Sequence, residues 1–254
     1  MMNKFFMGVC FSLLPISQLQ ASAVDVEFQH ETISFPEPPR VSLLLQVLNN
    51  QTKVDWPTAK LYRTDSPRQP QLLEDQRAIL ADLKALIIFW HQEQQISQQL
   101  SALRREIASW QLGVFVNTPL DLDLTMIRQD FNPVLSPGVY LLRATKRPNY
   151  VSIVALGGRN DVVYQQGKPA YQYLGEANFA DNVKAVDTVF YYPNHAYENL
   201  TGVKTIPVAA WNKTAEPLAN GTLLFVPIST DVLTEQYASL NDQIAELAQY
   251  RIAP

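Results

Sequence analysis

The longest regular pattern of hydrophobic and polar positions runs from residue 71 to residue 111. This stretch contains no proline or glycine, and its apolar residues recur at steps of three, four and seven. That spacing places them along one side of a helix. The pattern breaks between Trp90 and Ile96, where five consecutive residues are polar. We therefore expect two antiparallel helices that pack stripe against stripe.

The chain around this helical hairpin reads as short strands and turns. Residues 24–30 alternate apolar and polar side chains, which predicts a half-buried strand. Its hairpin partner is expected at 32–35, and helical spacing of apolar residues follows at 41–48. After the hairpin, Gly113 is expected to end the second helix, and strands are predicted at 114–116, 120–124 and 139–144. The helices at about 71–111 are therefore an insert within a first β module, which spans residues 24–146.

A second module, residues 147–229, is predicted to repeat the same order of elements. Gly157-Gly158 and Asn220-Gly221 are turn dipeptides, and Pro169 can open a short helix. The predicted strands lie at 150–156, 161–165, 188–192, 206–211 and 222–228. A strand pair followed by a short helix is the usual opening of a β-grasp module, so the predicted class is α+β.

Residues 230–254 carry a last amphipathic helix, predicted from about Glu235 to Arg251 with Thr234 as its N-cap. Its apolar stripe is narrow, and its flanks are acidic and rich in amides. This composition disfavours binding to an anionic membrane surface. We expect the helix to pack on the second module; the alternative is that it lines an oligomer or a membrane pore.

The first 23 residues resemble a secretory signal peptide. Lys4 precedes an apolar run that is too short to span a bilayer, and Ala21-Ser22-Ala23 offers a small-x-small cleavage site. We expect export to the periplasm with cleavage after about Ala23. The only cysteine, Cys10, lies inside this segment. The exported chain therefore has no disulfide, zinc–thiolate site or cysteine nucleophile.

Composition narrows the class of partner. The formal charge is −4 and no basic cluster stands out, so nucleic acid is not expected as a partner. No segment after the signal peptide is long and apolar enough to cross a membrane. The expected protein is a soluble periplasmic one of roughly 230 residues, a length that suits two small domains or one large one.

Catalytic signals are weak. His30, His91 and His195 have no carboxylate or second histidine at ligand spacing, so no metal site is predicted. Asp121 and Asp123 would point to the same face of the predicted strand, where a glycosidase pair is conceivable. Solvent-facing carboxylates are the commoner explanation for that arrangement. Motifs of nucleophile elbows, P-loops and dinucleotide sites are missing from the sequence.

The tryptophans are candidates for stacking on sugar rings. Trp90 and Trp110 fall on the helical stripes, which favours core packing. Trp56 and Trp211 border loops and are the better candidates for ligand contact. Arg104 lies off the second helical stripe; a solvated side chain is the default, and an interdomain hydrogen-bonding role is the alternative.

Three stretches resemble the GfcC-type family, whose members are periplasmic proteins of group-four capsule and exopolysaccharide assembly. They are Asp55-Trp56-Pro57-Thr58-Ala59, the run from Pro207 through Trp211-Asn212-Lys213 to Pro217, and the run from Tyr237 to Ile244. The likeness covers essentially the whole chain after residue 23. It singles out Asn212 and Lys213, beside Trp211, as candidate binding or interdomain residues.

This resemblance implies two tandem β-grasp domains, a helical hairpin inserted in the first, and a C-terminal amphipathic helix packed on the second. It also implies a layout like the periplasmic domains of outer-membrane polysaccharide export proteins, and it brings no enzymatic activity or cofactor. The family's central arginine, which helps to form a pocket, follows the glycine after the helical insert, but here Val114 follows Gly113. Either another arginine such as Arg104 fills that place, or the pocket differs in this branch.

The function expected from these observations is that of a non-enzymatic accessory protein in the assembly or export of a surface polysaccharide in a Gram-negative bacterium. Its expected partners are the glycan, the outer-membrane export machinery, or both. A polysaccharide-modifying enzyme and a pore-forming oligomer that uses the C-terminal helix are the alternatives.

Overall fold

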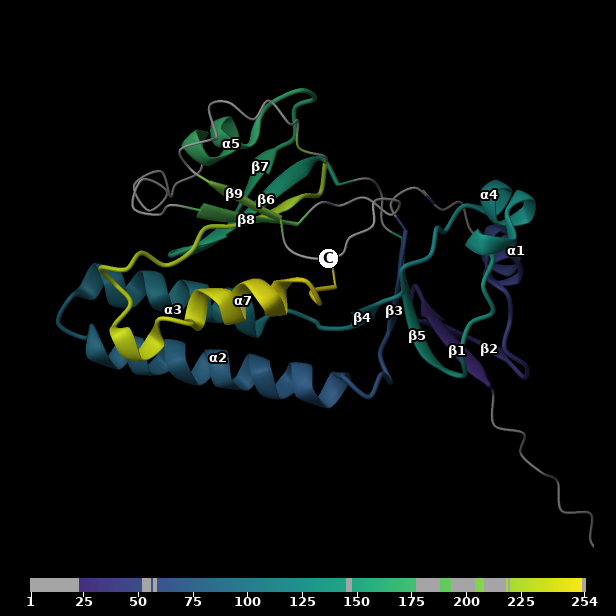
Figure 1. Ribbon diagram of the computed structural model, residues 1–254, viewed down its shortest axis with the longest axis horizontal. Helices are drawn as coiled ribbons and strands as arrows, with labels where there is room; N and C mark the ends of the chain where they lie inside the picture. Colours follow the sequence, from purple (N-terminus) through teal and green to yellow (C-terminus); the bar gives the residue numbers. More distant parts are fainter. Residues whose placement is uncertain are drawn as a thin grey trace, which may run out of the picture.

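The computed structural model shows a mixed α+β protein with two five-stranded sheets joined through a helical layer (Figure 1). It describes residues 23–51, 56, 59–144, 148–176, 188–192, 204–207, 218 and 220–252. No helix of these described ranges combines the length and the apolar character that crossing a membrane would require.

The first sheet has the strand order β2-β1-β5-β3-β4. β1 pairs in parallel with β5, and the other pairings are antiparallel. Helix α1 packs its apolar side on one face, where the core holds Tyr140 and Leu142 of β5. The elements are β1 (Val24–Phe28), β2 (Glu31–Phe35), α1 (Val41–Gln51), β3 (Lys60–Arg63), β4 (Val114–Phe115) and β5 (Gly138–Arg143).

The second sheet, ordered β7-β6-β10-β8-β9, has the same topology as the first. β6 pairs in parallel with β10, and a helix, α5, again follows the first hairpin. This confirms the repeated order predicted from the sequence. The elements are β6 (Tyr150–Ala155), β7 (Gly158–Val163), α5 (Ala170–Glu176), β8 (Thr188–Tyr192), β9 (Lys204–Pro207) and β10 (Leu223–Phe225).

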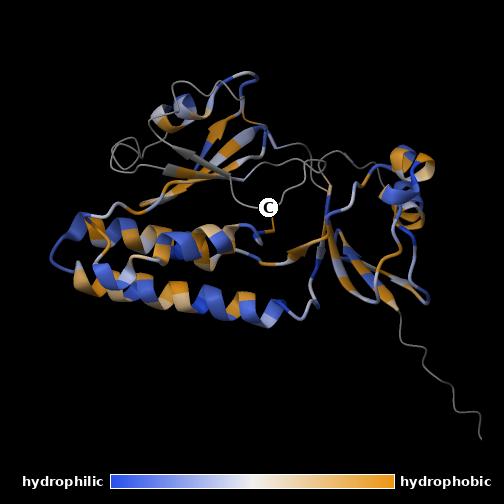
Figure 2. Ribbon diagram, viewed as in Figure 1, coloured by the Kyte–Doolittle hydropathy of each residue, from blue (hydrophilic) through white to orange (hydrophobic). Residues whose placement is uncertain are grey.

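The predicted helical hairpin consists of α2 (Gln69–Phe89) and α3 (Gln94–Ala108). Along both helices, hydrophobic positions alternate with hydrophilic ones (Figure 2). The hydrophobic ones share one core with Val154 of β6 and Phe225 of β10. The hairpin is therefore inserted in the first module by sequence but buries its stripe against the second sheet. Its buried members are Leu72, Ile79, Leu83, Leu86, Leu100, Leu103 and Ile107.

The C-terminal helix is shorter than the sequence pattern predicted. α7 spans Leu240–Ala248, and the residues before it form a 3₁₀ turn, η4 (Glu235–Tyr237). Thr234 occupies the N-cap position of η4 but makes no side-chain capping hydrogen bond. The Asn241 side chain accepts from Ile228 N and donates to Ile228 O, both at 2.8 Å. These two bonds fix the start of α7 to the chain that leaves β10.

The strand predicted at 120–124 is wrong: α4 (Leu122–Ile127) begins there instead, followed by a 3₁₀ turn, η2 (Gln129–Phe131). Asp121 is the N-cap of α4, and its Oδ1 accepts from Leu124 N at 2.9 Å. A carboxylate at this position satisfies a backbone N–H that has no partner within the helix. Asp121 and Asp123 therefore do not form a pair on one strand face.

The prediction that Gly113 ends the second helix is wrong, because α3 ends at Ala108, five residues earlier. The C-terminal segment crosses at Gly113 instead: Gly113 N donates to Tyr250 O at 2.9 Å. A Cβ on residue 113 would lie 3.1 Å from Ile252 Cδ1 and 3.2 Å from Tyr62 Cβ. This glycine is needed for close approach between two segments rather than for helix capping.

Candidate functional site

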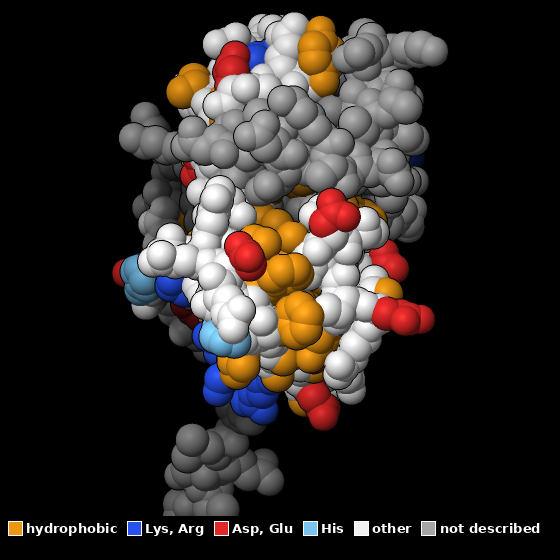
Figure 3. All heavy atoms as spheres, turned by 90° about the vertical axis from the view of Figure 1, so that its left-hand side faces the viewer, with side chains coloured by type: hydrophobic (Ala, Val, Ile, Leu, Met, Phe, Trp, Pro, Cys, Tyr) orange, Lys and Arg blue, Asp and Glu red, His pale blue; other side chains and the backbone are white. Residues whose placement is uncertain are grey.

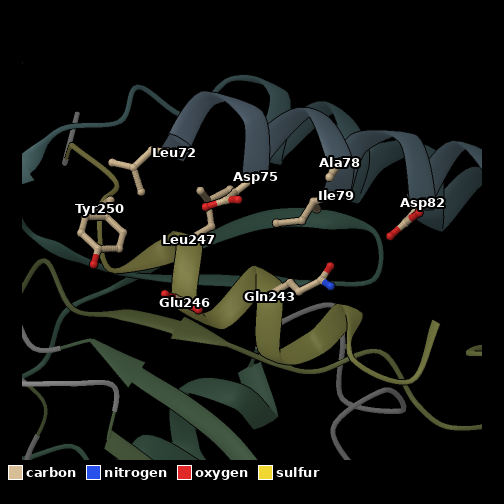
Figure 4. A pocket seen from close by; sticks show the side chains of 9 residues that line it. All are labelled: Leu72, Asp75, Ala78, Ile79, Asp82, Gln243, Glu246, Leu247 and Tyr250. Atoms are coloured by element: carbon tan, nitrogen blue, oxygen red, sulfur yellow. The ribbon is translucent and has the colours of Figure 1, made fainter. Parts of the chain in front are cut away.

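A groove lies between α2 and α7, with Tyr250, two residues after the end of α7, also in its lining (Figure 4). It encloses about 210 Å³. Its floor is formed by Leu72, Ile79 and Leu247, which belong to the core, while Ala78 and Tyr250 remain accessible at its sides. An apolar floor beneath accessible side chains is the usual form of a small-ligand site.

The walls of the groove carry carboxylates and an amide. α2 contributes Asp75 and Asp82, and α7 contributes Gln243 and Glu246. Asp75 and Asp82 are seven residues apart, so they lie on one side of α2 about 10 Å from each other along its axis. The groove thus presents three carboxylates that can only accept hydrogen bonds and one amide that can both donate and accept.

Arg68 contacts two of the residues that line the groove. Its Nη2 donates to Glu246 Oε1 at 3.1 Å, and its guanidinium carbon lies 4.6 Å from the centroid of the Tyr250 ring. Asp75 Oδ1 accepts from Gln71 Nε2 at 2.8 Å. With one arginine against three carboxylates, the groove has an excess of negative charge.

A cluster of charged residues lies just beyond Tyr250, where the C-terminal segment joins the first sheet to the hairpin. Leu112 and Arg251 form a β-bridge, and Ile252 N donates to Gln111 O at 2.8 Å. The Arg251 side chain is only 9% exposed, with its Nη2 3.9 Å from Glu106 Oε1. We call this group the junction cluster; it consists of Lys60, Glu106, Arg143, Arg159, Asp161 and Arg251.

The junction cluster holds more positive than negative groups, and the pKa values of three of its cations are shifted. Burial, with the nearby Arg251 guanidinium, lowers the pKa of Lys60 to about 8. Burial and repulsion from Arg159 lower the pKa of Arg251, while Glu106 and Asp161 act in the opposite direction. Burial disfavours the charged form of Arg159, but two hydrogen bonds to Asp161, of 2.7 and 2.9 Å, raise its pKa overall.

Hydrogen bonds to neighbouring elements give the junction cluster a structural role. Trp110 Nε1 donates to Glu106 Oε1 at 3.0 Å, so the carboxylate on α3 that faces Arg251 is also held by Trp110, two residues after the helix end. Ser152 Oγ donates to Asp161 Oδ1 at 2.8 Å, which ties the other carboxylate to β6. The cluster therefore fixes the end of α7, and with it Tyr250 in the adjacent groove.

The structure places Trp56 and Arg104, the two predicted candidates that it describes, outside the lining of the groove. Trp56 packs partly on the core of the first sheet, with its Nε1 3.4 Å from Asn49 Oδ1. Arg104 donates from Nε to Leu80 O at 3.0 Å, so it ties α3 to α2 within the hairpin. Trp211, Asn212 and Lys213 lie outside the described residues.

Trp90 and Trp110 pack in the hairpin core, as predicted from their place on the stripes. Trp90 Nε1 donates to Val232 O at 2.9 Å. Of the alternatives for an arginine near Gly113, Arg104 is not beside it. The arginine that pairs with the neighbouring residue Leu112 is Arg251, which comes from the far end of the chain. Groups of three or more potential metal ligands are lacking in the described part of the chain.

Sequence reasoning missed the groove residues. Asp75 and Asp82 carried a usable signal, because two carboxylates seven residues apart lie on one side of a helix. Glu246 and Tyr250 gave none, since nothing local shows that α7 would lie across α2.

Comparison with known protein families gives two matches. Capsule biosynthesis GfcC, N-terminal, matches residues 20–147, and Capsule biosynthesis GfcC C-terminal matches residues 159–253. The first match contains the first sheet and the hairpin, and the second contains most of the second sheet and α7. The α2 wall of the groove therefore comes from the N-terminal match, and the α7 wall comes from the C-terminal match.

Proposed function

The chain belongs to the GfcC family of capsule biosynthesis proteins, and on that basis we propose that it is a non-enzymatic accessory protein that binds sugar residues of a surface polysaccharide in the groove between α2 and α7. It would act in the periplasm, during assembly or export of the polymer. The composition of the groove is the observation that carries this proposal.

The groove offers the two kinds of contact that a sugar ring needs. Carboxylates and amides accept hydrogen bonds from hydroxyl groups, and here they come from two different helices, at Asp75, Asp82, Gln243 and Glu246. The Tyr250 ring supplies an apolar surface on which the C–H face of a pyranose can pack. Both walls are anchored by the core, so little ordering entropy is lost on binding.

The charge of the groove limits which sugars it accepts. Three carboxylates face one arginine, and that arginine is already paired with Glu246. A uronic acid would bring a further negative charge into this site, which like-charge repulsion disfavours. We therefore propose that the groove takes neutral sugars or sugars with a free amino group.

The proposal also covers how the two sheets are organised as domains. We propose that each sheet with its α1 or α5 helix is a β-grasp domain, in keeping with the shared strand order. The junction cluster would then be the fixed connection between the two domains, and α7 would be the element through which the second domain completes a site begun by the insert of the first.

A polysaccharide-modifying enzyme is the competing function, because Asp75, Asp82 and Glu246 are carboxylates in a groove. Binding and turnover can be separated in one experiment. The chain from residue 24 onwards is titrated with cello-, chitosan- and galacturonate oligosaccharides, with binding followed by NMR and products by chromatography. We expect binding of the first two, none of the third, and no products; release of shorter oligosaccharides would favour the enzyme.

Substitutions then locate the site. Tyr250→Ala and Asp82→Asn should each weaken binding by about tenfold, as loss of a central contact does. Glu74→Gln is the matched control, because Glu74 is an exposed carboxylate on α2 outside the groove. In cells, deletion of the gene should reduce surface polysaccharide while cytoplasmic synthesis of the repeat unit continues. Equal effects of the groove and control variants would place the site elsewhere.

A further inference from the structure

The free end of the helical hairpin exposes two large hydrophobic side chains. Ile88 is 62% exposed and Phe89 is 60% exposed, and they are the last two residues of α2. Figure 3 looks at this end of the molecule and shows hydrophobic side chains gathered there. Contiguous exposed apolar groups of this kind mark interaction sites more often than scattered ones do. We call this surface the hairpin tip.

Trp90, the residue after the hairpin tip, is anchored to the rest of the molecule. It donates from its indole Nε1 to Val232 O and from its backbone N to Leu86 O, both at 2.9 Å. The Phe89 ring contacts the Trp90 ring edge to face, with centroids 5.2 Å apart. An apolar contact presented on such a fixed base loses little entropy when a partner binds.

A hollow adjoins the exposed pair. It encloses about 510 Å³ between the end of α2 and η4, with Ala85, Ile88 and Phe89 on one side and Thr234, Gln236 and Tyr237 on the other. A hollow of this kind beside a projecting ring can receive one large side chain of a partner, as the anchor pockets of protein interfaces do.

The charged side chains closest in sequence to the hairpin tip are almost all acidic. Residues 85–103 and 226–250, which form the tip and its surroundings, contain no lysine or arginine. They carry Glu93, Asp231 and Glu235, all exposed, while the nearest cation in sequence is Lys84, one turn before Ile88. In Figure 3, carboxylates flank the apolar side chains on several sides, a histidine lies beside them, and Lys or Arg groups appear at the lower edge and along the left side. A complementary partner would be positively charged.

Two other occupants fit less well. Ile88 and Phe89 together expose roughly 250 Å², taking about 200 Å² for each large side chain, whereas a stable dimer buries about 800 Å² per partner. A second copy would also bring its own carboxylates against these. An anionic lipid surface attracts basic patches rather than acidic ones.

We propose that the hairpin tip binds a short basic segment of a protein partner, in which an aromatic or large aliphatic residue lies between lysines or arginines. The anchor residue enters the hollow beside Phe89, and the basic residues face Glu93, Asp231 and Glu235. The last groove residue on α2, Asp82, lies about 10 Å before Phe89 along the helix. The groove and the hairpin tip share no lining residue, so we treat them as separate sites.

The test uses the chain from residue 24 onwards and three synthetic peptides that carry a fluorescent label. The first has one tryptophan between two pairs of lysines; in the second the lysines are glutamates, and in the third the tryptophan is serine. Fluorescence anisotropy should show binding of the first alone. Phe89→Ser should weaken it by about tenfold, and Glu235→Gln by roughly threefold, with loss of most binding in high salt.

Ile127→Ser is the matched control, because Ile127 on α4 is 81% exposed and lies in the first module. Ile88→Ser provides a second variant at the tip, and circular dichroism checks that each variant folds. The proposal is overturned if the lysine peptide does not bind, if the glutamate peptide binds as well, or if Ile127→Ser weakens binding as much as Phe89→Ser. Binding of phosphatidylglycerol vesicles or self-association that depends on Phe89 would also overturn it, in favour of a membrane or a second copy.

Discussion

The two sheets share one topology but differ in how many of their faces are covered. β1 alternates buried residues with exposed ones: Val24, Val26 and Phe28 are buried, while Asp25 and Glu27 are not. In β6, the equivalent strand, every residue after Tyr150 is buried. The same position in the same topology therefore has a different sequence pattern.

The cause is the helical hairpin. The second sheet has α5 on one face, over Ile153 and Leu224, and the hairpin with α7 on the other, over Val154 and Phe225. Strands that are buried on both faces read as continuous apolar runs. The first sheet has α1 on one face, and among the described residues its other face is covered only where Ile252 packs on Tyr62 and Leu141. The insert of one module thus supplies the second layer of the other.

The largest test of this contrast is Phe225→Ala. Phe225 is fully buried, stacks on Phe190 with ring centroids 5.8 Å apart, and faces the hairpin. Its truncation should lower the free energy of unfolding by about 3–5 kcal/mol, as measured by urea denaturation. Val139→Ala is the control on β5, the equivalent strand of the first sheet, where the side chain is 43% exposed; its cost should stay below about 1 kcal/mol. Similar costs would mean that the hairpin does not cover the second sheet.

A smaller effect is expected at the covered corner of the first sheet, where Lys60 lies on β3 directly across from Arg143. The pKa of Lys60 falls from 10.5 to about 8. Below pH 8 the lysine is charged in both the native and the unfolded chain, and its burial costs about 3 kcal/mol, at 1.36 kcal/mol per pKa unit. Between pH 8 and 10.5 the native lysine loses its proton first, so the cost disappears as the pH rises.

Lys60→Met should therefore raise the free energy of unfolding by about 3 kcal/mol at pH 7, with the gain lost by about pH 10.5. Urea denaturation across this pH range measures it. Lys84→Met, at an exposed position of α2, should change stability by less than about 0.5 kcal/mol at either pH. A gain at Lys60 that does not depend on pH would show that packing by methionine, and not the buried charge, is responsible.

Much of the fold was predictable because its signals are local. The stripes from Leu72 to Leu86 and from Leu100 to Ile107 specify two helices whatever they pack against. The alternation of β1 likewise predicted one covered face. The wrong prediction of a strand at Asp121 to Leu124 has an equally local reason. Over five residues, the alternation of apolar and polar positions expected of a strand is also compatible with an N-cap followed by one helical turn. Only the bond from Leu124 N to the Asp121 side chain separates them.

The site was less predictable because it is made by elements distant in sequence. An apolar stripe shows that something covers it but does not say what, so α7 across α2 could not be inferred. Arg251 illustrates the same limit. It follows a helix end with no motif around it, yet it pairs with Leu112 and lies near Glu106. The sequence offered Arg104, whose place on the hairpin is clear but whose bond to Leu80 O stays inside the hairpin.

The smallest expected effect concerns the first hairpin of each sheet. The β6–β7 turn has glycines at its positive φ angles, 100° at Gly157 and 98° at Gly158, whereas the β1–β2 turn has Gln29 at 50° and His30 at 72°. A side chain in this left-handed region strains the backbone, and glycine relieves the strain but makes the unfolded chain more flexible. His30→Gly should therefore stabilise the protein by only about 0.5–1 kcal/mol, as measured by urea denaturation. His30→Ala keeps the Cβ and removes the imidazole, so it should give no gain; an equal gain from alanine would assign the effect to the imidazole and leave the two turns equivalent in backbone strain.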